Sequence, residues 1–447
     1  MDMREVNTAL IAGDYSHPGV LPKLDELREQ PFVMHANFGL DDLPAEPGLL
    51  LVRGARQYGK STWLQQNIAA TIAQFGPGSA LYIDGDHLRD ANALVESIRN
   101  LLPAYAAKAP VRRLFIDEIT AVRDWQKGLK QLLDQGELKR VLVVTTGSKA
   151  ADLRHGAERL PGRKGKLSRT SYIFTPVTYA EFKRVTAPYI QHADLLPAYL
   201  LSGGSPCASA SLALHGHLPD YIIEMVRDWI YGEVSASGRS RPMMVGIMEC
   251  LMRFSGVPVG QSKLAREAGV ANNTVAAGYV ELLSDLLSVA PCFTWDEGHQ
   301  RINRRRPCKF HVTNLLVAAV WHPARLRRPA DFLSLSPVVQ GGLLEWLIAQ
   351  ELFRRAAIAG DAFPEIMSFW RSPNHEIDFV LAPDRFLEIK RGRTGPMEFT
   401  WFPKCFPHGH LTVISESRFE TDHVHGITIE DFLLGNEKVR SPVLKML

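Results

Sequence analysis

Short apolar runs that end in polar residues recur through the first third of the chain. Four runs have the length and continuous hydrophobicity of buried strands: 48–53, 80–84, 113–117 and 140–146. Stretches of helical composition lie between them, at 61–75, 91–102 and 125–138. Strands that alternate with helices predict βαβ units, and therefore an α/β fold built on a parallel sheet.

The first of these strands leads directly into the motif GxxxxGK[ST]. The motif and the residue after it comprise Gly54, Ala55, Arg56, Gln57, Tyr58, Gly59, Lys60, Ser61 and Thr62. Strand, glycine-rich turn and helix form the context of a phosphate-binding loop, in which backbone N–H groups and the helix N-terminus face phosphate oxygens. We therefore expect ATP binding, with Lys60 reaching the β- and γ-phosphates and the Ser61 hydroxyl on Mg²⁺.

The third strand ends in a pair of acids about sixty residues after this loop. Asp117 is expected to hold Mg²⁺ through water, and Glu118 to orient the water that attacks ATP. The fourth strand ends in Thr145 and Thr146, followed by Ser148. Ligands bind beyond the carboxyl ends of parallel strands, so these hydroxyls are candidate sensors of the γ-phosphate; they also suit a simple strand end.

Length and composition bound the remaining possibilities. A chain of 447 residues predicts two to four domains, and 46% hydrophobic with 22% charged residues is ordinary globular composition. No run of about 18 uncharged apolar residues occurs, so no membrane partner is expected. The five cysteines are scattered without CxxC spacing, which favours a reducing, cytoplasmic location and gives no zinc site. The net charge of +3 by itself decides nothing about nucleic acid.

The order of these motifs resembles a family of prokaryotic AAA-type ATPases, related to the STAND and archaeal-ATPase branch, which carry a winged helix and a C-terminal domain of unknown function. Further segments contribute to the resemblance: 160–163, 175–182 and the Gly-Gly-Ser-Pro turn at 203–206. It implies an arginine finger or sensor at Arg163, although a solvated basic loop is an equally simple reading. A finger acting in trans would require a homo-oligomer. Lys149 departs from the family pattern, which prefers a small polar residue there.

The segment 243–290 changes character and resembles a helix-turn-helix. A helix is expected at 243–254, a second from Ser262 to a turn at Gly269, and a third from Asn272 to Leu283. The polar side chains at the start of the third helix, those of Asn272, Asn273 and Thr274, could read DNA bases or could cap the helix.

A basic stretch without any acid follows this segment. It contains Arg301, Arg304, Arg305, Arg306, Lys309, Arg325, Arg327 and Arg328. The part at 301–309 is expected on a wing hairpin, where cations commonly contact phosphates, so DNA is the expected partner. A solvated face is the alternative for any run of charge.

The C-terminal third places acids in apolar surroundings. Glu345 lies in an apolar helix at 341–353, while Asp378 and Glu388 belong to an expected β-hairpin whose second strand continues to Lys390. Glu388 and Lys390 point to one face, and Asp378 can meet them across the hairpin. Two carboxylates could hold Mg²⁺ while the lysine activates water. Glu376 alternates with Asp378, so either acid could be the ligand.

This arrangement resembles the PD-(D/E)xK restriction-endonuclease-like fold, and the strand expected at 411–415 would extend it. The resemblance implies an active site of Asp378, Glu388 and Lys390, with Glu345 assisting as a metal ligand. Such domains can also serve as docking modules without cleavage activity. We therefore expect five parts: an N-terminal extension, a P-loop core, a helical lid, a winged helix and a nuclease-like domain, at 1–40, 41–190, 191–240, 241–330 and 331–447.

Three functions suit this organisation. The first is an ATP-hydrolysing protein that binds, remodels or cuts DNA in genome maintenance or defence. The second is a STAND-like signalling ATPase with an inactive C-terminal interaction module, and the third is a motor that remodels DNA junctions without cutting them.

Overall fold

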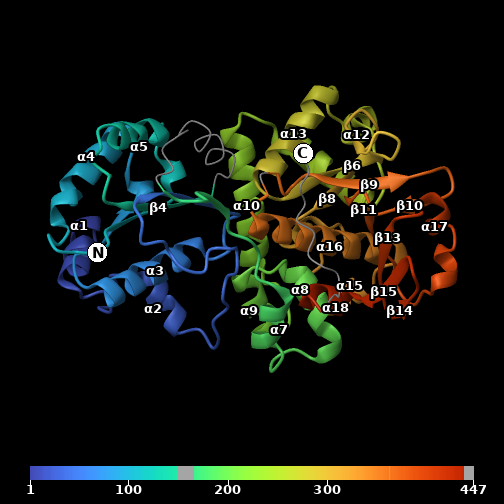
Figure 1. Ribbon diagram of the computed structural model, residues 1–447, viewed down its shortest axis with the longest axis horizontal. Coiled ribbons are helices and arrows are strands. Elements are labelled where there is room, and N and C mark those ends of the chain that lie inside the picture. Colours follow the sequence, from blue (N-terminus) through green and yellow to red (C-terminus); the bar gives the residue numbers. More distant parts are fainter. Residues whose placement is uncertain (149–165, 362, 437–447) are drawn as a thin grey trace. The chain divides into compact units, whose positions relative to one another are not determined.

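The computed structural model describes residues 1–148, 166–361 and 363–436. The chain divides into two compact units, Met1–Thr175 and Pro176–Leu447, each with its own sheets and core. Their elements are labelled along the chain in Figure 1. The P-loop core was expected to extend to residue 190; the first unit ends at Thr175.

The first unit is built on a five-stranded parallel sheet in the order β2-β3-β4-β1-β5. Its strands are β1 (Gly48–Arg53), β2 (Ala80–Asp84), β3 (Arg113–Asp117), β4 (Leu142–Gly147) and β5 (Ser171–Ile173). The four strands expected from the apolar runs are confirmed, because continuous hydrophobicity suits strands that are buried on both faces. The short fifth strand, β5, carried no comparable signal.

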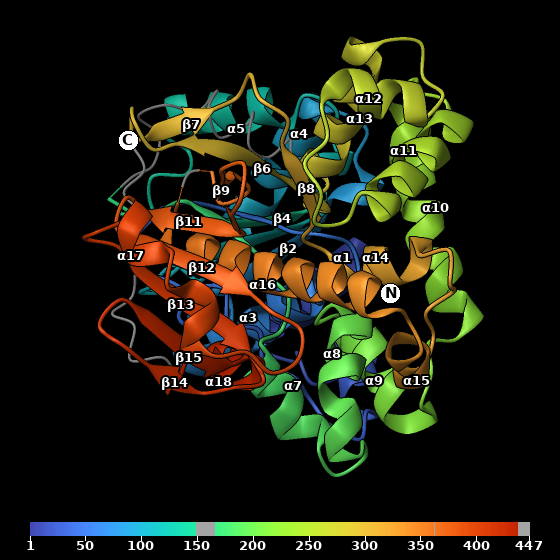
Figure 2. The same cartoon turned by 90° about the vertical axis from the view of Figure 1, so that its right-hand side faces the viewer.

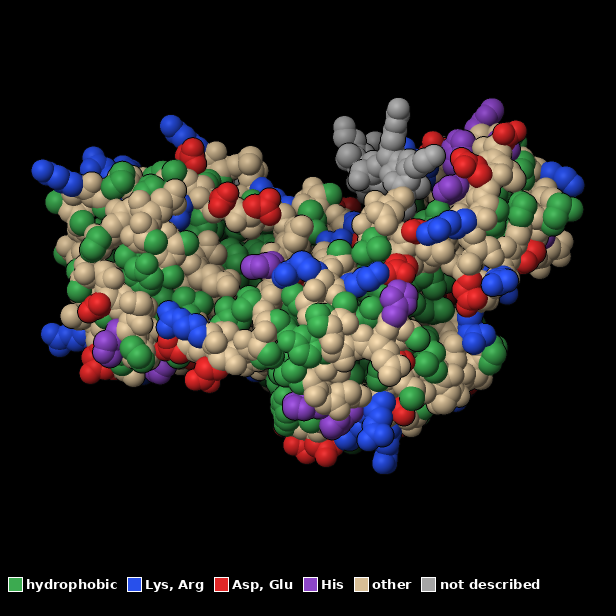
Figure 3. Space-filling model, turned by 90° about the horizontal axis from the view of Figure 1, so that it is seen from below, with side chains coloured by type: hydrophobic (Ala, Val, Ile, Leu, Met, Phe, Trp, Pro, Cys, Tyr) green, Lys and Arg blue, Asp and Glu red, His purple; other side chains and the backbone are tan. Residues whose placement is uncertain are grey.

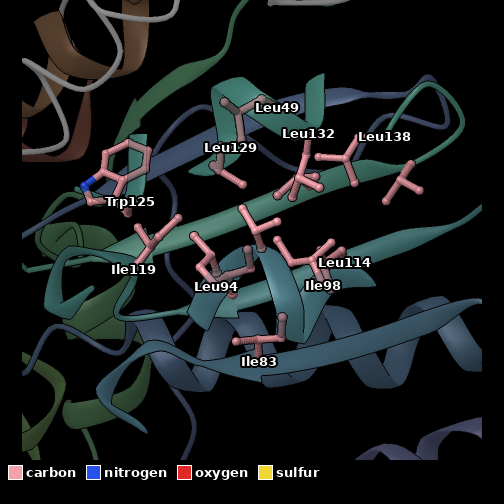
Figure 4. Close-up of a cluster of buried hydrophobic side chains, with 14 of the residues drawn as sticks. Leu49, Ile83, Leu94, Ile98, Leu114, Ile119, Trp125, Leu129, Leu132 and Leu138 are labelled. Carbon is pink, nitrogen blue, oxygen red and sulfur yellow. The ribbon is translucent and has the colours of Figure 1, made fainter. Parts of the chain in front are cut away.

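Helices cover both faces of this sheet. They are α3 (Lys60–Phe75), α4 (Ala91–Leu101) and α5 (Trp125–Asp134), with short 3₁₀ turns at 85–87, 102–104 and 119–121. Figure 4 shows one core, in which side chains of α4 and α5, among them Leu94 and Leu129, pack against strand residues such as Leu114. Helix α3 contacts β2, β3 and β4 but contributes nothing to this cluster, so it covers the other face.

The N-terminal extension packs on the edge of the sheet through α1 (Met3–Ala12), which is followed by α2 (Pro22–Arg28). The Asn7 amide donates to the Tyr82 carbonyl at 2.7 Å and accepts from the Tyr82 N–H at 2.8 Å. Because β2 is an edge strand, this side chain satisfies backbone groups that would otherwise lack a strand partner.

The second unit begins with a group of helices that includes the segment 191–240, where a lid is expected. These are α7 (Tyr179–Thr186), α8 (Leu195–Ser202), α9 (Pro206–His215), α10 (Asp220–Ala236), α14 (Leu315–Trp321) and α15 (Pro329–Leu333), with a 3₁₀ turn at 192–194. The turn after α8 requires glycine: Gly203 has a φ of 56°, and a Cβ there would lie 2.4 Å from the Leu316 nitrogen. The close packing of α8 on α14 depends on that absent side chain.

Three further helices precede an antiparallel hairpin. The helices are α11 (Arg241–Arg253), α12 (Gln261–Glu267) and α13 (Asn273–Asp285); the strands are β6 (Val289–Asp296), β7 (Arg301–Asn303) and β8 (Lys309–Val312). Both β7 and β8 pair antiparallel with β6, and a bridge joins Val259 to Cys308. The two helices expected within 262–283 are present.

Of the remaining strands, two extend the sheet of β6, and five form a separate sheet. The strand β9 (Met367–Arg371) pairs parallel with β6 and antiparallel with β10 (Glu376–Ile377). A five-stranded sheet follows in the order β11-β12-β13-β15-β14, with β11 (Phe379–Ala382), β12 (Arg385–Ile389), β13 (His410–Ser415), β14 (Phe419–Glu420) and β15 (Val424–Thr428). The expected hairpin, β11-β12, and the expected strand at 411–415 are therefore present.

The long helix α16 (Pro337–Ala359) runs beside this last sheet, as Figure 2 shows, and contacts β8 and β12. Shorter helices complete the unit: α17 (Phe402–Cys405), α18 (Ile429–Leu434) and a 3₁₀ turn at 396–399. Since β6 pairs with β9, one sheet crosses the boundary expected at residue 330.

Within the described ranges, no helix combines the length and the hydrophobicity that a membrane span requires.

Candidate nucleotide site and acidic pocket

The loop between β1 and α3 has the backbone that a phosphate cradle requires. Gln57 and Gly59 have φ values of 66° and 97°, in the left-handed region. A Cβ on Gly54 would lie 2.8 Å from the Phe174 Cβ and 2.9 Å from the Phe174 carbonyl oxygen, so this position accepts only glycine. The loop ends at Lys60, the first residue of α3, which places the helix N-terminus at the loop.

Lys60 folds back into this loop. Its Nζ donates to the carbonyl oxygens of Gly54 at 3.0 Å and Ala55 at 2.9 Å, and the residue is buried. Burial lowers the pKa of Lys60, against the opposing effect of the Glu118 and Asp117 carboxylates. A phosphate oxygen entering the loop would offer the ammonium a charged acceptor in place of two neutral carbonyls.

Asp117, at the end of β3, is bonded by two hydroxyls. Thr146 Oγ1 donates to Asp117 Oδ1, and the Ser61 hydroxyl also bonds to this carboxylate. Burial raises the pKa of Asp117, and the two hydroxyls partly offset this effect. Ser61 and Asp117 thus bring together two hard oxygen ligands, which suit the Mg²⁺ that accompanies ATP.

Glu118 follows in the left-handed conformation, with a φ of 43°. Its Oε2 accepts from both the backbone N–H and the hydroxyl of Ser148, each at 3.1 Å. Two of the candidate sensors, Thr146 and Ser148, therefore contact the two acids. Thr145 does not, because its hydroxyl donates to the Leu50 carbonyl in the neighbouring strand. The arginine candidate Arg163, like Lys149, lies outside the described residues.

A second site lies in the second unit, as a pocket of about 410 Å³. It is lined mostly by polar and aromatic residues: Gly341, Glu345, Asn374, His375, Glu376, Asp378, Glu388, Ile389, Lys390, Glu398, Phe399 and Trp401. We call it the acidic pocket. The nuclease-like residues expected from the sequence all line it, because α16 and the β11-β12 hairpin converge there.

The hairpin locks two of these acids together. Asp378 Oδ2 accepts from the Ile389 N–H at 2.9 Å, and Glu388 Oε2 accepts from the Asp378 N–H at 3.2 Å. Lys390 Nζ lies 2.5 Å from Glu388 Oε1. Burial, followed by repulsion from Asp378, raises the pKa of Glu388. The expected meeting of the three side chains is thus present.

The position of Lys309 differs from the one that the sequence predicted. It was expected on an exposed wing as a DNA contact, but it is completely buried, because its side chain extends from β8 into the protein interior. Its Nζ lies 2.9 Å from Glu345 Oε1, 2.8 Å from Glu376 Oε1 and 2.9 Å from Asp378 Oδ1. Sequence reasoning missed this role, although a lysine within an apolar strand was a signal.

The expected metal centre of Glu345, Asp378 and Glu388 is also not formed as a ligand set. In the described part of the chain, no group of three or more His, Cys, Asp or Glu side chains is arranged to hold a metal ion. Glu345 is buried on α16 with Lys309 as its hydrogen-bonded cation. Burial raises the pKa of Glu345 to about 8, reinforced by Asp378 and opposed by Lys309.

The candidate DNA contacts on α13 and the hairpin are exposed, apart from Lys309. Asn272 caps α13 by accepting from the Val275 N–H, and Asn273 donates to the Ser262 hydroxyl at 3.0 Å. The other exposed candidates are Thr274, Arg301, Arg304, Arg305 and Arg306. On the face in Figure 3, basic and acidic side chains are interspersed.

Comparison with known proteins finds a similarity in the region of the first site. Residues 46–183 match a protein-family model described as an AAA domain, and this region contains Lys60, Asp117 and Glu118. This region, most of which lies in the first unit, is therefore similar to an AAA domain. No curated protein matches the sequence.

Among solved structures, the Walker-type ATPase paby2304 of Pyrococcus abyssi aligns at a TM-score of 0.41 and 14% identity, covering 67% of this chain and 94% of that one. The ORC2 protein of Aeropyrum pernix gives 0.36 and 12%, over 55% and 82%. RuvB of Thermotoga maritima gives 0.31 and 18%, over 54% and 82%. Similarities of this size say nothing about function.

Proposed function

We propose that this chain is an ATPase that uses ATP to act on DNA. The observation that supports the ATPase part of this proposal is the convergence of Lys60, the Ser61–Asp117 pair and Glu118 at the carboxyl end of one parallel sheet. The match of this region to an AAA domain supports it. These are the side chains that ATP hydrolysis needs, in the place where parallel sheets bind their ligands.

Each residue has a distinct part in this proposal. Lys60 would leave the loop carbonyls for the β- and γ-phosphates and neutralise charge that develops there. Ser61 and Asp117 would hold Mg²⁺, which neutralises phosphate charge. Glu118 would orient the attacking water once its carboxylate is released from Ser148. Thr146 keeps Asp117 in position.

The second half of the proposal rests on the elements 241–312. Three helices, a strand-like bridge at Val259 and a hairpin occur in the order of a winged helix. The exposed N-terminus of α13 could enter a groove, and the arginines at 304–306 could contact phosphates. This charge distribution favours DNA action over a purely signalling ATPase, in which no nucleic acid is bound.

One experiment separates these functions. ATP turnover is measured with and without duplex and branched DNA, alongside DNA affinity, for the wild type and for Lys60→Ala. We expect turnover that DNA stimulates and that Lys60→Ala abolishes. Turnover that is unaffected by Lys60→Ala would refute the ATPase site, and an absence of DNA binding at low salt would favour signalling.

A charge-reversed hairpin tests the DNA surface itself. Replacing Arg304, Arg305 and Arg306 with Glu should weaken DNA binding roughly 10- to 100-fold and flatten its salt dependence, because phosphate contacts are lost. The matched control reverses Lys108, Lys139 and Arg140, three exposed cations of the first unit. Equal losses in both variants would show a general effect of charge rather than a site.

Cleavage of DNA by the acidic pocket is a second candidate, suggested by the gathering of Glu345, Asp378, Glu388 and Lys390. The lysine that already contacts three of its acids favours a docking role instead. Incubation of DNA with protein, Mg²⁺ and ATP distinguishes them: cleavage that Asp378→Ala and Lys390→Ala both abolish would establish the nuclease, and binding without cleavage would support docking.

A further inference from the structure

The acidic pocket contains a cation of its own. Lys309 Nζ has three N–H donors, and three carboxylate oxygens lie at hydrogen-bond distance, from Glu345, Glu376 and Asp378. The side chain of Lys309 is only 1% exposed, so water does not share these contacts. The ammonium therefore has the full set of partners that it can use.

Glu388, another acid of the pocket, also has a cationic partner, because Lys390 lies against it. Glu376 has a second one, since Arg371 Nε is 3.5 Å from its Oε2. Each of these four carboxylates is thus paired with a lysine or an arginine. A divalent ion entering among them would have to displace an ammonium that is already desolvated and bonded.

The titratable neighbour of Lys309 on β8, His311, does not replace it as a cation. His311 is buried two residues further along β8, and its Nε2 is 3.8 Å from Glu345 Oε1, beyond hydrogen-bond distance. Burial, reinforced by the positive charge of Lys309, holds the pKa of His311 well below its ordinary value, so it is neutral. Burial alone lowers the pKa of Lys309, but Asp378, Glu345 and Glu376 outweigh it and raise that pKa well above its ordinary value.

We infer that Lys309 is the resident cation of the acidic pocket and occupies the place in which a nuclease of this arrangement would bind a divalent metal. These four acids therefore have cationic partners without metal, and three of them depend on a residue supplied by β8 rather than by the nuclease-like segment. This inference does not depend on ATP hydrolysis or on DNA binding by the hairpin.

Manganese binding to nucleotide-free protein tests the inference without any activity assay. Bound Mn²⁺ is counted by electron paramagnetic resonance for the wild type and for Asp378→Asn, with total Mn²⁺ up to millimolar concentrations. We expect equal counts, because the pocket binds none. A stoichiometric Mn²⁺ that the wild type binds and Asp378→Asn loses would overturn the inference.

Removing the ammonium should create the metal site that Lys309 replaces. Lys309→Met leaves three acids, of which Glu345 is buried, without their shared cation, so we expect a fall of roughly 10 °C in the melting temperature. We also expect one additional Mn²⁺ to bind, and this ion should restore part of the lost melting temperature. An unchanged melting temperature together with an unchanged Mn²⁺ count would overturn the inference.

Two further variants guard against a simple folding defect. Lys309→Met combined with Glu345→Gln removes one charge of each sign, and it should recover most of the melting temperature without gaining Mn²⁺. Lys390→Met is the matched control: it removes a partly exposed lysine from the same pocket and should lower the melting temperature much less. A larger fall in melting temperature for Lys390→Met than for Lys309→Met would mean that Lys309 is not the resident cation.

Discussion

Two groups of acids, one in each unit, differ in the donors that hold them. Asp117 and Glu118 are held by hydroxyls and backbone N–H groups, from Ser61, Thr146 and Ser148, which bring no net charge. Asp378 and Glu345 are held by the ammonium of Lys309. Neutral donors position a carboxylate and leave its negative charge available to an incoming cation. An ammonium already compensates that negative charge. Acids and lysines at the right spacing therefore do not by themselves make a metal site.

The largest difference between the two groups of acids is expected when one acid in each group is replaced by its amide. Glu118→Gln should lower ATP turnover roughly 10²- to 10⁴-fold, the usual contribution of a group that activates water. Glu388→Gln should leave turnover without DNA unchanged. Steady-state phosphate release measures both, and similar losses in the two variants would mean that the acids do not have separate roles.

Stability provides the next contrast, again with one amide in each unit. Asp378→Asn removes a charge that Lys309 needs and should cost about 2–3 kcal/mol of unfolding free energy. Asp117→Asn should cost close to nothing, because burial raises the pKa of Asp117 and the charged form already has an unfavourable solvation energy. Urea unfolding monitored by tryptophan fluorescence compares them, and a costlier Asp117→Asn would contradict the distinction.

The Thr146 hydroxyl that donates to Asp117 can be removed with little change in the shape of the side chain. Thr146→Val deletes a buried hydrogen bond and should destabilise the protein by about 1–2 kcal/mol. Thr145→Val is the control with the same chemistry on the same strand, and its hydroxyl bonds to the Leu50 carbonyl instead. Only Thr146→Val should weaken the dependence of turnover on Mg²⁺; equal effects would deny Thr146 a part in the site.

The smallest effect is expected at Ser148. Ser148→Ala removes the hydroxyl that holds Glu118 but keeps the backbone N–H that donates to the same oxygen. We expect a change in turnover of about 3- to 10-fold, with thermal stability unaltered, because one of the two donors remains. Single-turnover kinetics with excess enzyme would show the change in the hydrolysis step, and an effect confined to ATP affinity would place Ser148 outside it.

The parts of the molecule that could be predicted from the sequence are those that depend on local sequence patterns. The strands of the parallel sheet, the loop at Gly54–Ser61 and the hairpin that brings Asp378 to Glu388 each depend on neighbouring residues, so apolar runs and turn chemistry were sufficient. The partners of Lys309 lie 36 and 69 positions away, on α16 and beside β10. Nothing local distinguishes a lysine on an exposed wing from one whose strand faces a buried helix.

The strand β6 has a practical consequence for dividing the protein. It pairs with β7 and β8 of the hairpin and also with β9, through the register Cys292 to Met367. A fragment that stops at residue 330 would leave one side of β6 as a bare edge, open to pairing with other chains. It would also leave the buried ammonium of Lys309 without its carboxylate partners. Expression of the helices and hairpin alone should therefore yield aggregates. A cut near residue 175 instead keeps every described strand with the strands that it pairs with.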